Sequence, residues 1–276
     1  MTDLTSYVPS PPPQWVENFA RFGLAAKGVV YSLIGLLAFM AAFEIGGQST
    51  DDTKRTGVLK TIQDLPAGNV LLGLTAIGLL CYAIWRFMQA IKDTEDKGSD
   101  AKGIARRLRY AFSGLVYGGF AFLAARMVIG DSGGGGTDSR ETLTASLLEQ
   151  PFGQWLVGIV AVGTIAAGIY QIYYGFSEKY KKEVHTSRVQ HEAEHLLIRA
   201  GKLGYMARGI VWLLIGYLFL QAALKARASE AGGNSEAFAL LENSSYGSFI
   251  LGAVALGLIL YGVFMFLRAK YQPIRA

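Results

Sequence analysis

The chain has 276 residues, of which 51% are hydrophobic, 17% are charged and 34 are glycine. This composition excludes an ordinary soluble domain and indicates a polytopic membrane protein. The formal net charge of +5 does not indicate nucleic-acid binding, because the basic residues flank apolar segments. The one cysteine, Cys81, lies inside an apolar run, so no intrachain disulfide is possible.

Residues 1–18 form a polar, proline-rich tail without the basic n-region and short apolar core of a cleaved signal peptide. We therefore expect the first spanning helix to direct insertion. Beyond the tail, six windows are apolar over the roughly 20 residues that a helix needs to cross a bilayer. Backbone groups in lipid must be paired internally, so these windows are predicted to be helices. They are residues 22–43, 70–91, 110–130, 152–176, 203–224 and 246–267.

Lysine and arginine are distributed unevenly between the two sides of this six-helix topology. The side that holds both termini carries 19 of them. The opposite side carries seven, namely Lys54, Arg55, Lys60, Arg126, Arg140, Lys225 and Arg227. The positive-inside rule therefore places both termini in the cytoplasm, with the protein in a bacterial cytoplasmic membrane. We expect anionic lipid head groups to contact the basic cytoplasmic loops, and we expect neither nucleic-acid binding nor a cofactor.

The first helices of three helix pairs share a pattern. The stretches "RFGLAAKGVVYSLIG", "RLRYAFSGLVYGGFA" and "KLGYMARGIVWLLIG" align without gaps. In each, a basic residue precedes a glycine by seven positions, and an aromatic residue follows that glycine by three. The basic residues are Arg21, Arg107 and Lys202, and the glycines are Gly28, Gly114 and Gly209. This is a threefold internal repeat, with repeat 1 at residues 19–92, repeat 2 at 105–176 and repeat 3 at 201–271.

The second helices repeat a G-x4-G-x4-G pattern, which contains Gly73, Gly158 and Gly252 as its middle glycines. Five residues turn a helix by about 500°, so successive glycines lie on faces roughly 140° apart. Small residues on two faces allow two neighbouring helices to approach closely. Each repeat has two spans, so the repeats are parallel and related by an axis along the membrane normal. The predicted fold is therefore all-α, with six transmembrane helices in three parallel two-helix repeats and pseudo-threefold symmetry.

These spacings, together with the "QPFG" loop that ends at Gly153, resemble the bacterial membrane proteins catalogued as domain of unknown function 1206. The resemblance covers residues 19–271. It implies three two-helix repeats and no established activity. Repeats 1 and 3 depart from the loop pattern, with "DLPAG" and "NSSYG" in its place.

Basic residues within the spans are candidate functional residues, because ionisable groups are costly in lipid. Lys27 and Arg208 occupy the same repeat position, which Ser113 occupies in repeat 2. Each lies about two turns inside the cytoplasmic end of its predicted span. Two interpretations are open: the side chains snorkel to the interface as anchors, or they form a basic ring for an anionic ligand. Arg21, Arg107 and Lys202 are further candidates for anchors or for residues on the axis.

The letters "HEAEH" at residues 191–195 match the H-E-x-x-H pattern of zinc hydrolases. Apolar residues at helical spacing predict an amphipathic cytoplasmic helix over residues 187–200, and they place His191 and His195 on its polar face. A catalytic zinc needs a third protein ligand in a shielded cleft, and nothing marks one. The pattern favours a solvated helix face over adventitious or regulatory metal binding, and over a hydrolase.

Two function classes follow from the sequence. The first, which we favour at this point, is a non-enzymatic structural or interaction protein, since no set of residues competent for a reaction is visible. The second is a transporter or channel for a small solute along the pseudo-threefold axis, with Lys27, Ser113 and Arg208 at its inner mouth. A zinc-dependent membrane hydrolase is a remote third. A continuous polar axis would favour transport, and a sealed apolar axis would favour the scaffold.

Overall fold

The computed structural model describes residues 14–45, 59, 62–63, 68–92, 98, 100–129, 139–150, 152–183 and 191–273, with the side chains of 139–143, 182–183 and 191–193 outside the description. The elements in these ranges are helices. Six are long and apolar enough to cross a membrane. They are α1 (Gln14–Ala42), α3 (Gly68–Lys92), α4 (Ala101–Val128), α6 (Gly153–Phe176), α7 (His191–Lys225) and α9 (Gly247–Tyr271). The chain is therefore an all-α polytopic membrane protein.

The first helix of each repeat begins earlier than the apolar windows predicted. The observed starts are Gln14, Ala101 and His191, against predicted starts at residues 22, 110 and 203. An apolar window detects only the stretch that crosses lipid, whereas the hydrogen-bonded helix continues through polar residues beyond it. The start of α4 is fixed by the side chain of Asp100, which accepts a 2.9 Å hydrogen bond from the backbone nitrogen of Gly103.

The predicted amphipathic helix is not a separate element. From His191 onward the backbone continues as one helix to Lys225, so residues 191–200 are the first turns of the third repeat's spanning helix. The apolar stripe, which could lie on the membrane surface or against the bundle, packs on the bundle, where Leu197 and Ala200 are fully buried. Residues 187–190, which carry the expected capping box, lie outside the described ranges.

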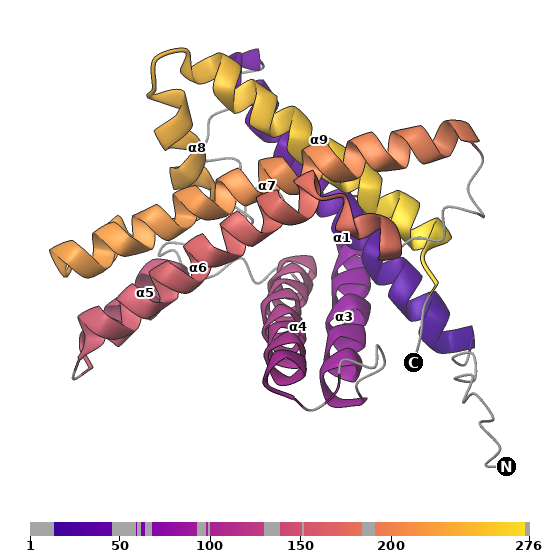
Figure 1. The fold of residues 1–276 in the computed structure, drawn as a ribbon, viewed down its shortest axis with the longest axis horizontal. Coiled ribbons are helices and arrows are strands. Elements are labelled where there is room, and N and C mark those ends of the chain that lie inside the picture. The colour runs from indigo at the N-terminus through magenta and orange to yellow at the C-terminus, as the bar shows by residue number, and fades with distance from the viewer. Residues whose placement is uncertain are drawn as a thin grey trace, which may run out of the picture.

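The three repeats are arranged as an incomplete ring through contacts between neighbouring repeats. The most extensive helix contacts join α3 to α4, α6 to α7, and α9 to α1 (Figure 1). Each of these pairs is the second helix of one repeat against the first helix of the next. Within repeats, α1 packs on α3 and α7 packs on α9, but α4 and α6 share no extended contact in the part of the chain described. The ring is therefore open within repeat 2.

Short elements connect the long helices at the end of the bundle where α1 ends and α9 begins, which we call the distal end; the opposite end is the proximal end. They include α5 (Ser139–Leu148) and α8 (Asn234–Glu242), which precede α6 and α9. Phe152 and Tyr246 each adopt φ 64° immediately before α6 and α9, and the following glycine donates a 2.8 Å backbone hydrogen bond to close the turn. Repeats 2 and 3 thus share one turn although their loop sequences differ. The remaining short elements are the 3-10 helices η3 (Lys179–Glu183) and η5 (Ala228–Glu230).

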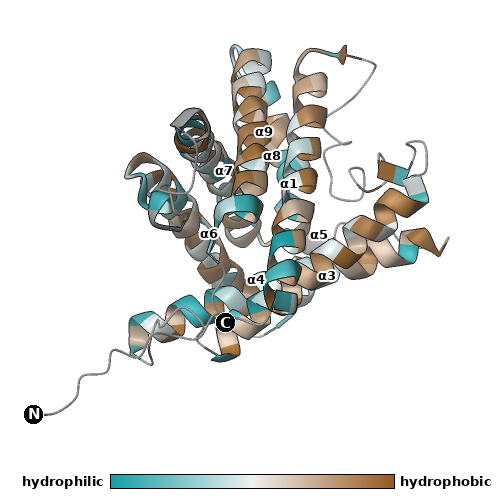
Figure 2. Cartoon of the chain, turned by 90° about the vertical axis from the view of Figure 1, so that its right-hand side faces the viewer, coloured by the Kyte–Doolittle hydropathy of each residue, from teal (hydrophilic) through white to brown (hydrophobic). Residues whose placement is uncertain are grey.

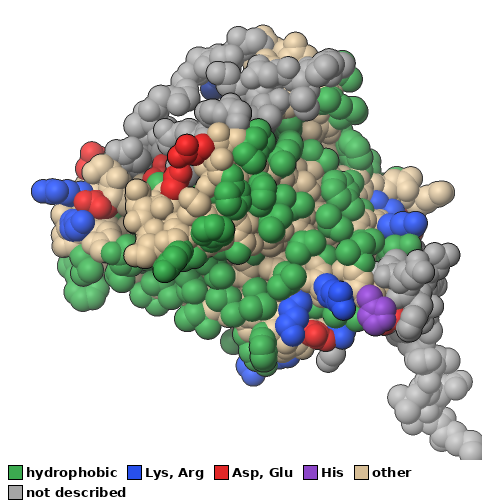
Figure 3. Space-filling view, turned by 90° about the horizontal axis from the view of Figure 1, so that it is seen from above, with side chains coloured by type: hydrophobic (Ala, Val, Ile, Leu, Met, Phe, Trp, Pro, Cys, Tyr) green, Lys and Arg blue, Asp and Glu red, His purple; other side chains and the backbone are tan. Residues whose placement is uncertain are grey.

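The surface of the bundle is apolar along the long helices. Figure 2 shows hydrophobic residues along most of their length. In Figure 3 hydrophobic side chains cover much of the face shown, while charged side chains and a histidine lie towards its margins. An apolar belt with charged margins is what a lipid-embedded bundle requires.

Candidate functional site

Lys27 lies at the centre of the bundle. It is the 14th of the 29 residues of α1, and its side chain is only 3% exposed. Its ammonium nitrogen donates a 3.2 Å hydrogen bond to the hydroxyl of Tyr82. Four tyrosine rings surround that nitrogen, with centroids 5.8 Å away for Tyr31, 5.0 Å for Tyr82, 5.3 Å for Tyr117 and 5.6 Å for Tyr261. The rings come from α1, α3, α4 and α9, so all three repeats contribute to the cage.

Arg208 lies beside the same cage, at the 18th of the 35 residues of α7. Its guanidinium carbon is 5.3 Å from the ring centroid of Tyr31 and 5.0 Å from that of Tyr261, the two rings that it shares with Lys27. One terminal nitrogen donates a 2.8 Å hydrogen bond to the Tyr261 hydroxyl. The Nε atom is buried and has no hydrogen-bond partner among the described residues. Arg208 therefore holds a donor that is free to bind a ligand.

Two more arginines extend this cluster towards the proximal end. Arg86 donates hydrogen bonds of 2.8 and 2.6 Å to the hydroxyl of Tyr82, and one of 2.7 Å to the side chain of Gln89. Arg268, 5% exposed, donates a 2.8 Å hydrogen bond to the side chain of Gln272. We call Lys27, Arg86, Arg208 and Arg268, with the tyrosines that link them, the central basic cluster.

Within the described ranges, no ion pair joins Lys27, Arg86 or Arg208 to a carboxylate. Helices α3, α4, α6 and α9 contain neither aspartate nor glutamate, and the acids within α1 and α7 lie in the first turn or so of each: Glu17, Glu192 and Glu194. Removing an ion from water costs several kcal/mol, and a cation over an aromatic ring recovers about 0.5–2 kcal/mol. Four rings lower this cost at Lys27, but they leave its positive charge without a carboxylate partner among the described residues.

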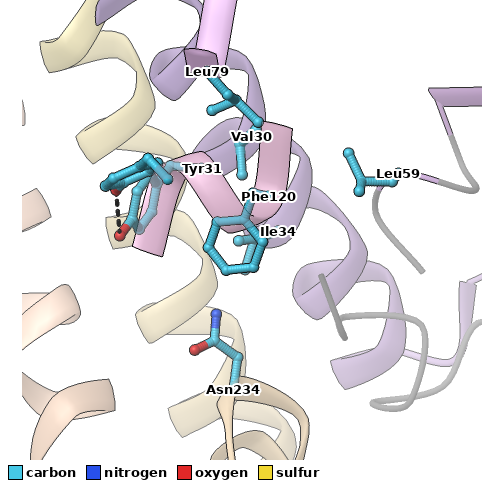
Figure 4. A pocket seen from close by; sticks show the side chains of 8 residues that line it. Val30, Tyr31, Ile34, Leu59, Leu79, Phe120 and Asn234 are labelled. Atoms are coloured by element: carbon cyan, nitrogen blue, oxygen red, sulfur yellow. Dashed lines mark hydrogen bonds between the residues drawn. The ribbon is translucent and has the colours of Figure 1, made fainter. Parts of the chain in front are cut away.

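A small cavity lies on the distal side of the tyrosine cage. It has a volume of about 20 Å³, and Tyr31, Tyr117 and Asn234 line it among apolar side chains (Figure 4). The hydroxyl oxygens of Tyr31 and Tyr117 are 3.5 Å apart, as the dashed line in Figure 4 marks. Because both tyrosines line the cavity and contact Lys27, they separate the two. A cavity of this size holds about one water molecule.

One protein-family model, described as Domain of Unknown Function (DUF1206), matches the chain three times, at residues 22–93, 108–178 and 203–272. The chain belongs to this family. The three matches confirm the resemblance inferred from the repeated glycines and aromatics. The chain is also 39% identical over 258 residues to the uncharacterized protein YxxB of Bacillus subtilis (strain 168). The aligned residues are 94% of this chain and 92% of the relative. No solved structure matches it.

The snorkelling interpretation of Lys27 is wrong. It placed the residue two turns from the helix end, but α1 begins at Gln14, so Lys27 lies mid-helix and its ammonium is enclosed by rings. Arg208 likewise points into the cluster instead of to the interface. Ser113, the equivalent on α4, is half-buried and brings no charge. The sequence alignment located the basic position, whereas Arg268 and the tyrosine partners on the second helices were missed.

Arg21, Arg107 and Lys202 connect neighbouring repeats at the proximal end. Arg21 donates to the backbone oxygens of residues 269 and 270 at the end of α9, the second at 2.7 Å. Arg107 donates to those of residues 90 and 91 at the end of α3, at 2.7 and 2.8 Å. Both arginines satisfy carbonyl groups that a helix end leaves unpaired. Lys202 lies 3.9 Å from Glu178, just beyond the end of α6.

The repeat glycines differ in what surrounds them. A Cβ atom on Gly28, Gly114 or Gly209 would lie 2.6–3.0 Å from a side chain of the neighbouring repeat. The middle glycines of the second helices do not behave alike. A Cβ on Gly252 would lie 2.8 Å from Phe43, but none of the described atoms comes within 4 Å of one on Gly73 or Gly158. The prediction that these two glycines are helix contacts is therefore wrong.

The histidines of "HEAEH" lie in the first turns of α7, and His195 is exposed. The side chain of His191 lies outside the description. Among the described residues there is no group of three or more histidine, cysteine, aspartate or glutamate side chains that could hold a metal ion. The hydrolase interpretation gains no support from this geometry.

Proposed function

We propose that this protein is a membrane carrier for an anionic solute, which binds at the central basic cluster. The observation that carries the proposal is the pair of mid-helix cations, Lys27 and Arg208, that share two tyrosine rings and have no carboxylate partner in the part of the chain described. An oxyanion would supply the missing negative charge. It would also accept hydrogen bonds from Lys27 and from the unpaired Nε of Arg208.

A carrier fits this geometry better than an open channel. Lys27 is only 3% exposed, and the cavity that Tyr31 and Tyr117 line has room for about one water molecule. Access on the distal side would require the Tyr31 and Tyr117 hydroxyls, 3.5 Å apart, to separate. A protein that binds its solute in a closed interior must open to either side in turn, as carriers do.

The scaffold that the sequence favoured gives no reason for the buried charge. Replacing buried charges with apolar residues of similar size often leaves the stability of the fold unchanged or raises it. A purely structural bundle therefore gains no stability from four interior cations. We retain the proposal that the protein is not an enzyme. We also propose that its basic loops contact anionic lipid head groups.

The location that we propose is the bacterial cytoplasmic membrane, with both termini in the cytoplasm, and its support is the unequal distribution of 19 and seven basic residues. Cysteines introduced at Ser99 and Ser187 should be protected from an impermeant thiol reagent in intact cells, and one at Ser132 should be labelled. The reverse labelling pattern would overturn this orientation. All three positions lie outside the described ranges.

Binding can be tested by the melting temperature of the purified protein in phosphatidylcholine nanodiscs with inorganic phosphate, sulfate, acetate or bromide. At a hundred times its dissociation constant, a bound anion stabilises the folded protein by about 2.7 kcal/mol. The double variant Lys27→Met and Arg208→Met should lose this stabilisation. The control Arg106→Met removes an exposed cation from α4 and should keep it.

Two results would overturn the proposal. One is the absence of stabilisation by all four anions. The other is stabilisation that the double variant retains in full, since the anion would then bind elsewhere, such as at the basic loops. A scaffold predicts one of these two results.

A further inference from the structure

Repeat 2 has different residues from repeats 1 and 3 at the positions where the two long helices of a repeat approach each other most closely. In repeat 1, a Cβ on Gly23 would lie 2.7 Å from the backbone of Tyr82. In repeat 3, a Cβ on Gly204 would lie 2.6 Å from the backbone of Tyr261. At this position repeat 2 has Arg109, which is too large for such an approach.

A second contact, one turn further along, shows the same difference. A Cβ on Gly78 would lie 2.4 Å from that of Ala26. The equivalent distance from Gly257 to Ala207 is 2.3 Å. Repeat 2 has Phe112 in place of the alanine. Its ring is 61% exposed, and no described atom lies within 4 Å of a Cβ on its glycine, Gly163.

The bulk of Arg109 and Phe112 therefore keeps α4 and α6 apart. We call the gap between these helices the α4–α6 seam and define it by Arg109, Phe112, Gly163 and Ala167. The two helices meet near the proximal end, where the Arg109 guanidinium lies 5.9 Å from the ring centroid of Tyr170. Ala167 is the repeat equivalent of Tyr82 and Tyr261, two of the rings around Lys27. Among the rings described around Lys27, none comes from the second helix of repeat 2.

The seam joins an apolar surface to a polar interior. Phe112 and Ile169, on the lipid-facing flanks, are 61% and 58% exposed. The Oε1 atom of Gln171 on α6 is buried without a hydrogen-bond partner in the described residues, and so is the Nε atom of Arg208 on α7. Both helices have the length and composition of membrane spans, so the outer flank faces acyl chains.

We propose that the solute is an anionic amphiphile, with its head on Lys27 and Arg208 and its acyl chain in the α4–α6 seam. This inference rests on the proposed function and names its substrate class. Charge complementarity selects the head, because Lys27 and Arg208 have no carboxylate partner among the residues that the structure describes. The surrounding bilayer selects the chain, because an apolar opening between two spans is solvated by hydrocarbon. The acyl chain enters the seam sideways from the membrane.

The test compares dodecyl phosphate, which has both parts, with inorganic phosphate, which has only the head, by their dissociation constants in phosphatidylcholine nanodiscs. The chain should strengthen binding by at least about tenfold, since each buried methylene is favourable. Dodecyltrimethylammonium has the chain with the opposite charge and should not compete. Substitution Gly163→Phe fills the seam, and the open space around this glycine permits the fold. It should weaken dodecyl phosphate binding by about tenfold or more and leave phosphate binding unchanged.

A matched control lies on the same helix. Gly158 has equally open surroundings, but it lines a separate groove of about 550 Å³ on the α6–α7 flank, together with Trp155 and Leu224. Gly158→Phe should leave both dissociation constants unchanged. A loss of dodecyl phosphate binding in Gly158→Phe alone would assign the chain to that groove and overturn the inference. The smaller substitution Gly163→Leu repeats the test if the phenylalanine variant melts early.

The outcomes separate this inference from the proposed function. If phosphate binding depends on Lys27 and Arg208 but Gly163→Phe and Gly163→Leu bind dodecyl phosphate normally, the lateral entry is wrong and the anion site stands. If neither probe depends on the two cations, the anion site is wrong and the inference falls with it.

Discussion

Repeats 1 and 3 pack their two long helices against each other through a glycine and an alanine, and repeat 2 places phenylalanine opposite its glycine and leaves the pair apart. The contacts between neighbouring repeats do not differ in this way, since Gly28, Gly114 and Gly209 all meet a neighbouring helix closely. The ring is therefore maintained by three similar interfaces between repeats. The interfaces within repeats are free to diverge, and the entrance that we propose lies at the one that has diverged.

The largest effect should come from leucine at the equivalent glycines Gly78, Gly163 and Gly257. In repeats 1 and 3 a side chain would collide with Ala26 or Ala207, so each leucine variant should lose about 3 kcal/mol of unfolding free energy. Gly163→Leu enters open space and should change stability by no more than about 0.5 kcal/mol. Melting temperatures in detergent check this order. Equal losses at all three positions would show that α4 and α6 pack as the other pairs do.

A smaller change in unfolding free energy, of opposite sign, is expected from Lys27→Met in a buffer without added phosphate, sulfate, acetate or bromide. The variant removes a buried cation that lacks a carboxylate, while the Tyr82 hydroxyl keeps its hydrogen bonds from Arg86. The unfolding free energy should rise by about 1–3 kcal/mol. Chemical denaturation measures it, with Ser113→Met as the control at the uncharged repeat position. A loss of stability in Lys27→Met would mean that the ring cage compensates the charge fully.

The smallest effect concerns Glu178, at the junction of repeats 2 and 3. A hydrogen bond from Lys181, aided by the positive charges of Lys181 and Lys202, holds the pKa of Glu178 below its ordinary value of 4.5. The carboxylate therefore contributes stability above pH 4.5, and the contribution is lost as the pH falls through the lower pKa of the folded state. Glu178→Gln should melt slightly earlier than the parent at pH 7 and together with it in strong acid. A difference that persists in acid would assign the effect to packing.

Much of the fold could be predicted from the sequence, because the patterns that specify spanning helices and repeats are local. Lipid requires long apolar helices, and six such windows were visible. The repeat was visible in ungapped spacings such as those around Gly28 and Gly114. Helix starts were misplaced by up to 12 residues in α7, because a helix that leaves the bilayer becomes polar without ending.

Only part of the central basic cluster could be predicted from the sequence. Alignment of the repeats located Lys27 and Arg208, but the tyrosines that surround them come from different helices, and their convergence depends on packing between repeats. The open seam had a signal that could have been read. Arg109 and Phe112 stand where the other repeats have glycine and alanine, and bulk at a close helix crossing predicts separation.

The central claim is that the buried cations hold an anion, and a high-resolution experimental map of the protein in lipid nanodiscs tests it most directly. We predict non-protein density within about 3 Å of both the Lys27 ammonium and the Arg208 Nε, the distance of a charge-assisted hydrogen bond. If the ligand is an amphiphile, this density continues between α4 and α6. A map in which a carboxylate of the chain itself contacts both cations, with no other density beside them, would contradict the claim.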